Sequence, residues 1–92
     1  MDDQAVSDNR ERQRFELLVG DQVVFADYRR RPGQISITHV EAPVNLRGSG
    51  AAGRLMQGVL DLIRAEGLRV LPLCSYARAW MQRHPEYEDL RL

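Results

Sequence analysis

A glycine-rich loop is the segment of this sequence best suited to bind an anion. Glycines occupy positions 48, 50 and 53, between an extended, β-rich run and an amphipathic helical pattern. The first amides of a helix have no intrahelical acceptor, and the helix dipole adds partial positive charge there. A phosphate or pyrophosphate is the natural ligand of such a site. We therefore predict that residues 46–54 bind a phosphorylated ligand. A small-residue helix start without a ligand is the structural alternative.

The loop also matches the dinucleotide-binding pattern G-x-G-x-x-G, but its context does not fit. A dinucleotide-binding fold needs more strands than this chain offers, and an acidic residue roughly 20 positions downstream. Leu73 and Cys74 stand at that distance instead. The loop also lacks the Gly-Lys-Ser/Thr ending of a P-loop, and the chain contains no lysine. The context of the loop therefore argues against the dinucleotide and P-loop interpretations.

Three further side chains are suited to acid–base or nucleophilic chemistry. His39 lies late in a predicted strand, and an imidazole exchanges protons near neutral pH. Glu41 follows two residues later, so it shares a face with His39 and could orient it or replace it as a base. Cys74 directly precedes a predicted helix, whose positive end favours the thiolate. The structural alternatives are a half-buried histidine, a solvated glutamate and an inert buried cysteine.

The pattern of apolar residues predicts an α+β domain with elements in the order β-β-β-α-β-α. Three strands form an antiparallel meander, and a crossover helix leads to a fourth strand that pairs in parallel with the third. The predicted strands are Phe15–Val19, Gln22–Arg29, Gln34–Glu41 and Leu68–Leu73, and the predicted helices run from about Ser49 to Glu66 and from Tyr76 to about Arg83. Ser75 is expected to cap the last helix.

Two details of the predicted sheet bear on the candidate site. Strict alternation in the third strand places Ile35, Ile37 and His39 on one face and Ser36, Thr38 and Val40 on the other. Pro72 must interrupt the pairing of the fourth strand, because proline has no amide hydrogen. Either Pro72 lies at an edge or bulge, or the two parallel strands part there, where open α/β sheets bind ligands.

Composition limits the classes of function. The chain has 92 residues, of which 43% are apolar, and this suits one small domain. Its 13 positive side chains balance 13 negative ones, which argues against a dedicated nucleic-acid-binding protein. A single cysteine excludes an internal disulfide and a Cys-rich zinc site. Neither a membrane span nor a signal peptide is recognised, so a cytoplasmic location is expected. The polar residues 1–13 are expected to form a disordered tail.

Four segments together resemble the small, single-domain proteins of the GNAT acetyltransferase superfamily. Arg47, Gly50 and Ala52 fit the R/Q-x-x-G-x-G/A loop motif of that superfamily. The other segments are Ile37–His39, Pro72–Cys74 and His84–Tyr87. The resemblance implies a minimal GNAT-like domain over residues 14–92, with three antiparallel strands and one parallel strand, and acetyl-CoA as the cofactor.

The resemblance also implies roles for individual residues. Loop amides of this superfamily bind the pyrophosphate of acetyl-CoA, and this assigns cofactor binding to Arg47, Gly48, Ser49, Gly50, Ala51, Ala52, Gly53 and Arg54, with Cys74 and Tyr76 nearby. His39, Glu41 and Cys74 are the candidate catalytic residues. Cys74 matches a cysteine proposed to act at the thioester, as a nucleophile or as a proton donor. Tyr76 could protonate the leaving CoA thiolate or only pack in the core.

Two classes of function follow from the resemblance. The first is an N-acetyltransferase that moves acetyl from acetyl-CoA to an unidentified amine, on a protein or a small molecule. The alternative is a non-catalytic CoA-binding or sensing module. The N-terminal helices and final β-hairpin of a full-length GNAT are absent from this sequence, and those parts usually build the acceptor pocket. A homo-oligomer could rebuild that wall, although no sequence feature establishes one.

Overall fold

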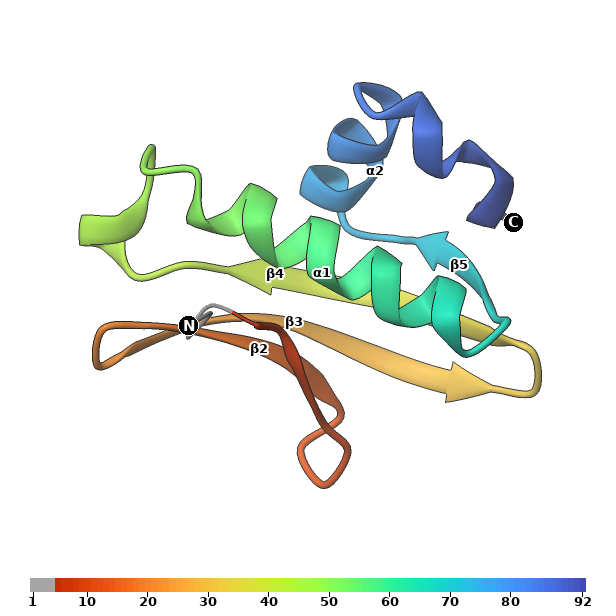
Figure 1. Ribbon diagram of the computed structural model, residues 1–92, viewed down its shortest axis with the longest axis horizontal. Coiled ribbons are helices and arrows are strands. Elements are labelled where there is room, and N and C mark those ends of the chain that lie inside the picture. The colour runs from red at the N-terminus through yellow and green to blue at the C-terminus, as the bar shows by residue number, and fades with distance from the viewer. Residues whose placement is uncertain (1–4) are drawn as a thin grey trace.

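The protein is built on a five-stranded sheet with strand order β1-β2-β3-β4-β5 (Figure 1). The computed structural model describes residues 5–92. Its strands are β1 (Ser7–Asn9), β2 (Arg14–Val19), β3 (Gln22–Arg31), β4 (Gln34–Glu41) and β5 (Arg69–Pro72). The first four strands pair antiparallel and β4 pairs in parallel with β5. The α+β class and the mixed sheet are therefore confirmed, and β1 is an addition to the predicted strands.

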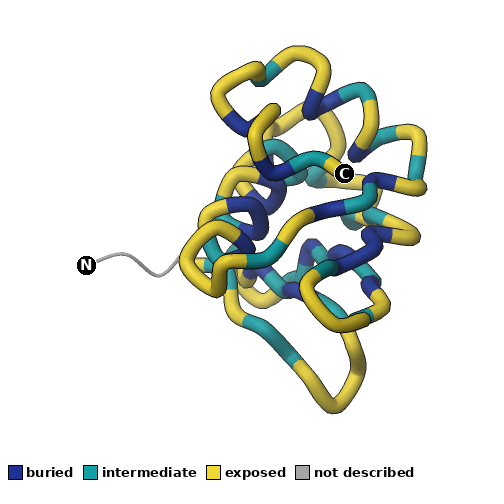
Figure 2. The backbone as a smooth tube through the Cα atoms, turned by 90° about the vertical axis from the view of Figure 1, so that its right-hand side faces the viewer, coloured by how far each residue is buried: buried dark blue, intermediate teal, exposed yellow. Residues whose placement is uncertain are grey.

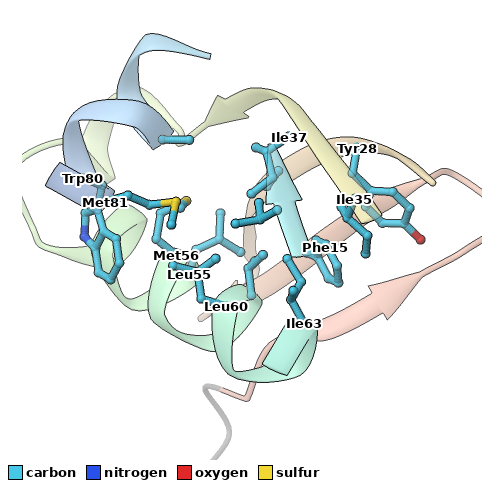
Figure 3. Packing of buried hydrophobic residues seen from close by; sticks show 14 of the residues in the cluster. Phe15, Tyr28, Ile35, Ile37, Leu55, Met56, Leu60, Ile63, Trp80 and Met81 are labelled. Carbon is cyan, nitrogen blue, oxygen red and sulfur yellow. The ribbon is translucent and has the colours of Figure 1, made fainter. Parts of the chain in front are cut away.

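Two α-helices cover one face of this sheet. They are α1 (Ala51–Ala65) and α2 (Ser75–Gln82), with short 3₁₀ helices at Val44–Leu46 and Pro85–Leu90. The apolar stripe of α1 packs against Phe15, Ile35 and Ile37, and α2 adds Trp80 and Met81 to the same cluster (Figure 3). We call the sheet face under the helices the inner face and the opposite one the outer face.

The expected disordered tail is wrong for residues 7–9, which form β1 and pair with β2. The Asp8 carboxylate accepts hydrogen bonds from the Tyr28 hydroxyl at 2.6 Å and from an Arg30 guanidinium nitrogen at 2.8 Å. Val6 packs against the core, close to Gly58 of α1. The hydrogen bonds of one residue, Asp8, thus help to hold in place a segment whose average composition indicated disorder. The expectation for residues 1–4 lies outside the described residues.

A β-bulge in β4 corrects the predicted faces of that strand. Tyr28 pairs with Ile37, but Asp27 pairs with His39, so Thr38 is an extra residue without a partner on β3. A bulge reverses the alternation beyond it. His39 therefore shares a face with Asp27 on the outer side, and Val40, which was predicted opposite Ile35 and Ile37, joins them on the inner side. The simple period-two pattern could not show this inserted residue.

The two parallel strands part beside Pro72. Pairing of β4 with β5 ends at Ile37 and Pro72, and β5 is the last strand in the order of the sheet. The amides of Leu73 and Cys74 both donate to the Ile37 carbonyl, at 2.9 and 3.2 Å, as the chain turns toward α2. Pro72 is thus both an edge residue and the point of parting. The remainder of β4 continues without a β5 partner in the described part of the chain.

The burial pattern agrees with a single layer of helices on one side (Figure 2). Buried residues follow α1 and the inner positions of β2, β3 and β4, whereas the turns are exposed. No helix in residues 5–92 combines the length and apolarity needed to cross a membrane.

Candidate functional site

The glycine loop leads directly into α1 and leaves amides free at its start. Gly48 and Gly50 have φ values of 83° and 90°, a left-handed conformation that strains any residue with a Cβ. Gly50 is the N-cap residue and has no side chain to satisfy the first amides. The amides of Ala52 and Gly53 donate no hydrogen bond within the described structure. This helix start therefore offers two free donors and the positive end of a 15-residue helix.

A cavity of about 520 Å³ opens beside this loop, between the end of β4 and α2. Its volume is in the range of small-molecule sites. Of the predicted site residues, the cavity is lined by His39, Glu41, Arg47, Gly48, Gly50, Ala52, Gly53 and Tyr76. The structure thus brings together most of a set that is spread over nearly 40 positions of sequence. We call this space the loop cavity.

Four predicted residues do not line the loop cavity. The Ser49 hydroxyl accepts from the Ala51 amide at 3.3 Å and donates to the Leu46 carbonyl, so Ser49 shapes the loop. The Ala51 side chain is fully buried in the core. Arg54 is exposed, and a guanidinium nitrogen of Arg54 reaches back to within 3.7 Å of the position of a Cβ on Gly50. Cys74 is the fourth.

Cys74, and not Ser75, is the N-cap of α2, so the predicted cap is wrong. Its sulfur accepts a hydrogen bond from the Ala77 amide at 3.4 Å, while Ser75 is already the first helical residue. Cys74 Sγ thus lies at the positive end of a helix, as expected, but the residue packs against the core. Its backbone is fixed at Ile37, two residues before His39. The His39 side chain lies on the outer face, whereas Cys74 packs against the core, and the edge of β4 that is unpaired in residues 5–92 runs between the two positions.

The His39 imidazole and the Glu41 carboxylate form the polar pair of the site. Nε2 of His39 lies 2.8 Å from Oε1 of Glu41, and each side chain is about half exposed, at 53% and 52%. The bulge leaves both residues on the outer face, so the predicted shared face is confirmed, whereas its predicted side, with Ile35 and Ile37, is wrong. The Phe25 ring lies edge-on to the imidazole, with centroids 6.3 Å apart. The carboxylate can therefore orient the imidazole.

Tyr76 is a partly buried phenol in the wall of the loop cavity. Burial raises the pKa of Tyr76 above its ordinary value, the Cys74 side chain raises it further, and Arg83 opposes the shift. A raised pKa keeps the hydroxyl protonated at neutral pH. The Tyr76 hydroxyl can therefore donate a hydrogen bond at neutral pH.

The sequence analysis missed three apolar residues that line the loop cavity. Val40, Ala42 and Leu46 supply apolar surface beside the glycines. Val40 was placed on the wrong face of β4 because the bulge was not foreseen, and Ala42 lies in the connection that was treated only as the approach to the loop. Leu46 lay within the predicted binding segment, residues 46–54, but its side chain was given no role. An apolar connection that precedes a glycine loop was the available signal for a lined cavity.

Comparison with known proteins identifies the family. The family model for the GCN5-related N-acetyl-transferase domain matches residues 14–90. A solution structure of a GCN5-like putative N-acetyltransferase from Staphylococcus aureus superposes with a TM-score of 0.69 at 20% sequence identity, covering 100% of this chain and 91% of that one. This likeness confirms the fold, and the search of curated proteins gave no match. Because this family model matches most of the chain, the chain belongs to the GCN5-related N-acetyltransferase family.

Proposed function

We propose that the protein transfers an acetyl group from acetyl-CoA to an amine. The observation that carries this proposal is the start of α1, where the free amides of Ala52 and Gly53 line the loop cavity. Two free donors at a helix N-terminus suit the pyrophosphate of CoA, and Arg47 at the cavity wall adds a cation. Left-handed glycines keep bulk away from this surface. The residues present therefore fit the cofactor that the family uses.

The end of β4 suits the extended arm that joins the pyrophosphate of acetyl-CoA to its thioester. Residues beyond Ile37 have no β5 partner in the described structure, so backbone groups along this edge are available to an extended ligand. The apolar walls formed by Val40, Ala42 and Leu46 suit an aliphatic arm. Acetyl-CoA supplies an acetyl group activated as a thioester when it is bound.

The polar residues supply the proton transfers of the reaction. An amine must lose a proton as its C–N bond to the acetyl carbon forms and the thioester C–S bond breaks. His39 is the acceptor for that proton, with Glu41 holding the imidazole through their 2.8 Å contact. Tyr76, whose hydroxyl stays protonated, is the donor to the departing thiolate. The role of Cys74 at the thioester is retained as a prediction that its variants test.

Binding and turnover can be tested separately. Trp80 is the only tryptophan, and its Nε1 lies 3.3 Å from the position of a Cβ on Gly53, so its fluorescence should respond to a ligand at the loop. We expect acetyl-CoA to change this emission saturably, and mass spectrometry of the natively purified protein to detect bound CoA. Amine-dependent release of CoA then tests transfer. Binding without release would support the non-catalytic alternative, and no fluorescence response together with no bound CoA would refute both.

A further inference from the structure

A second cavity lies on the far side of the β4 bulge from the loop cavity. It has a volume of about 420 Å³ and is lined by Glu11, Arg12, Gln13, Asp27, Tyr28, Arg29 and Thr38. We call it the bulge cavity. Its residues come from the β1–β2 turn, from the middle of β3 and from the extra residue of β4. None of these lining residues belongs to a helix, and in Figure 1 the β1–β2 turn extends away from α1.

His39 lines one of the two cavities and pairs with a residue of the other. His39 lines the loop cavity, and its register partner on β3 is Asp27, which lines the bulge cavity. Thr38, the residue before His39, also lines the bulge cavity and donates a hydrogen bond from its hydroxyl to the Asp27 carbonyl at 3.3 Å. A molecule that contacts the Asp27 carboxylate would therefore lie on the same face of the sheet as the His39 side chain.

The β1–β2 turn that forms one wall of the bulge cavity is held in place by several hydrogen bonds. Gln13 has a φ of 54°, an uncommon value for a residue with a side chain. Its carbonyl accepts from the Tyr28 amide at 3.0 Å, and its amide donates to the Arg10 carbonyl at 3.2 Å. The Asn9 side chain accepts from the Arg12 amide at 3.1 Å. This wall therefore exists before any ligand binds.

The bulge cavity is lined by equal numbers of acidic and basic side chains. Two acidic residues, Glu11 and Asp27, and two basic residues, Arg12 and Arg29, line the same open depression. Within residues 5–92 none of these four side chains makes an ion pair. Other acidic groups near this end of the sheet, including Asp8 and Glu16, are already paired with arginines. A ligand with one positive and one negative group would satisfy both kinds of charge.

We propose that the bulge cavity binds the acetyl acceptor, and that this acceptor is a small amine that also carries a carboxylate, of which a free amino acid is the simplest form. The proposal rests on the proposed acetyl transfer. The Asp27 carboxylate holds the ammonium group beside His39, and Arg12 and Arg29 hold the carboxylate. The ammonium group must lose two protons: the first passes through the half-exposed His39 imidazole to bulk water before the nitrogen attacks. His39 then takes the second as the C–N bond forms and the thioester C–S bond breaks, while Tyr76 protonates the departing thiolate. Asp27 and Arg29 are positioning residues in this scheme.

The test uses the twenty free amino acids, each tested singly, and their α-carboxamides, which keep the amine and lack the carboxylate. With CoA bound, at least one amino acid should shift the backbone NMR signals of Glu11, Asp27 and Thr38, and its carboxamide should bind about tenfold more weakly. In a CoA-release assay, Asp27→Asn should raise the KM for that amino acid about tenfold and leave the KM for acetyl-CoA unchanged. Asp21→Asn, an exposed aspartate in the β2–β3 turn, is the matched control.

The proposal is overturned if no amino acid shifts the NMR signals of Glu11, Asp27 and Thr38, or if the carboxamides bind as tightly as the amino acids. It is also overturned if Asp27→Asn has the same KM values as Asp21→Asn. The NMR comparison uses the unaltered chain, so it decides even if Asp27→Asn does not fold. CoA release with other amines in the absence of these shifts would refute the acceptor assignment alone. Shifts without CoA release for any amine would refute the proposed transfer and leave the binding site in place.

Discussion

The Nε2 atom of His39 lies 2.8 Å from Oε1 of Glu41, and both side chains project from the outer face of the sheet. This relationship depends on Thr38, because without the bulge His39 would point toward α1 and the core. The inserted residue thus exposes an imidazole that strict alternation would bury. It also leaves His39, which lines the loop cavity, paired with Asp27, which lines the bulge cavity.

Removal of the imidazole should separate turnover from binding. His39→Ala is expected to lower kcat by about 10²–10⁴-fold, the usual contribution of a general base, without reducing the affinity for acetyl-CoA. Glu41→Gln, which keeps a hydrogen-bonding group, should cost less. Because both side chains are half exposed, stability should change by less than about 0.5 kcal/mol. Normal turnover in His39→Ala, measured as CoA release, would leave His39 without a catalytic role.

Two variants of Cys74 distinguish a cap from a reactive thiol. Cys74→Ser can still accept a hydrogen bond from the Ala77 amide, whereas Cys74→Ala cannot and should lose about 1 kcal/mol of stability. If Sγ carries the acetyl group, both variants lose activity while still binding CoA. If Sγ only donates a proton, the serine variant keeps a substantial part of the activity. Full activity in both, with only the difference in thermal stability, would make Cys74 a structural residue.

The fold could be predicted well where local pattern and local structure agree. The third predicted strand, Gln34–Glu41, has the predicted bounds. The other predicted strands and helices also exist, and none of their ends is shifted by more than two residues. Gly67, which is left-handed at φ 72°, follows α1 where a helix C-terminus was expected. In each case the signal is contained within a few neighbouring residues.

The errors arose where distant contacts decide the structure. Strand β1 exists because Asp8 meets Tyr28 and Arg30, which lie some 20 positions away, and composition cannot show such a contact. The bulge is set by pairing with β3, so strict alternation misplaced His39 and Val40. Most of the loop cavity could be predicted because the glycines mark it, but its apolar wall carries no distinctive motif.

The stability of the protein should fall at high pH through Tyr87. Burial, with a further contribution from the hydrogen bond to Asp61 at 2.8 Å, raises the pKa of Tyr87 to about 12. Since the unfolded chain ionises near pH 10, the stabilisation is complete below about pH 10 and is lost as the pH rises toward 12. Tyr87→Phe should flatten the decline in the free energy of unfolding between pH 9 and pH 12. An equally steep decline in the variant would contradict this assignment.

The effect of Gly58→Ala on stability should show whether Val6, the residue before β1, packs against α1. Gly→Ala inside a helix normally stabilises by about 1 kcal/mol. Here a Cβ on Gly58 would lie 2.3 Å from a methyl carbon of Val6 and 2.8 Å from its Cβ, so Gly58→Ala should destabilise the full chain. In a chain that begins at residue 10, the same substitution should stabilise. Stabilisation by Gly58→Ala in both chains, measured by chemical denaturation, would show that Val6 does not pack there.

The most direct test of the central claim measures the rise in Tm caused by acetyl-CoA in Gly50→Glu and in its control Gly33→Glu. Both glycines have a left-handed backbone, with φ values of 90° and 78°, and a Cβ added at either position would lie more than 3.4 Å from any other group. The two substitutions should therefore lower the free energy of unfolding by similar amounts. Only Gly50 lines the loop cavity. We predict that acetyl-CoA raises the Tm of the unaltered chain and of Gly33→Glu by mass action and has no effect on Gly50→Glu. An equal rise in both variants, or a response to NADH and not to acetyl-CoA, would contradict the assignment of the loop to CoA.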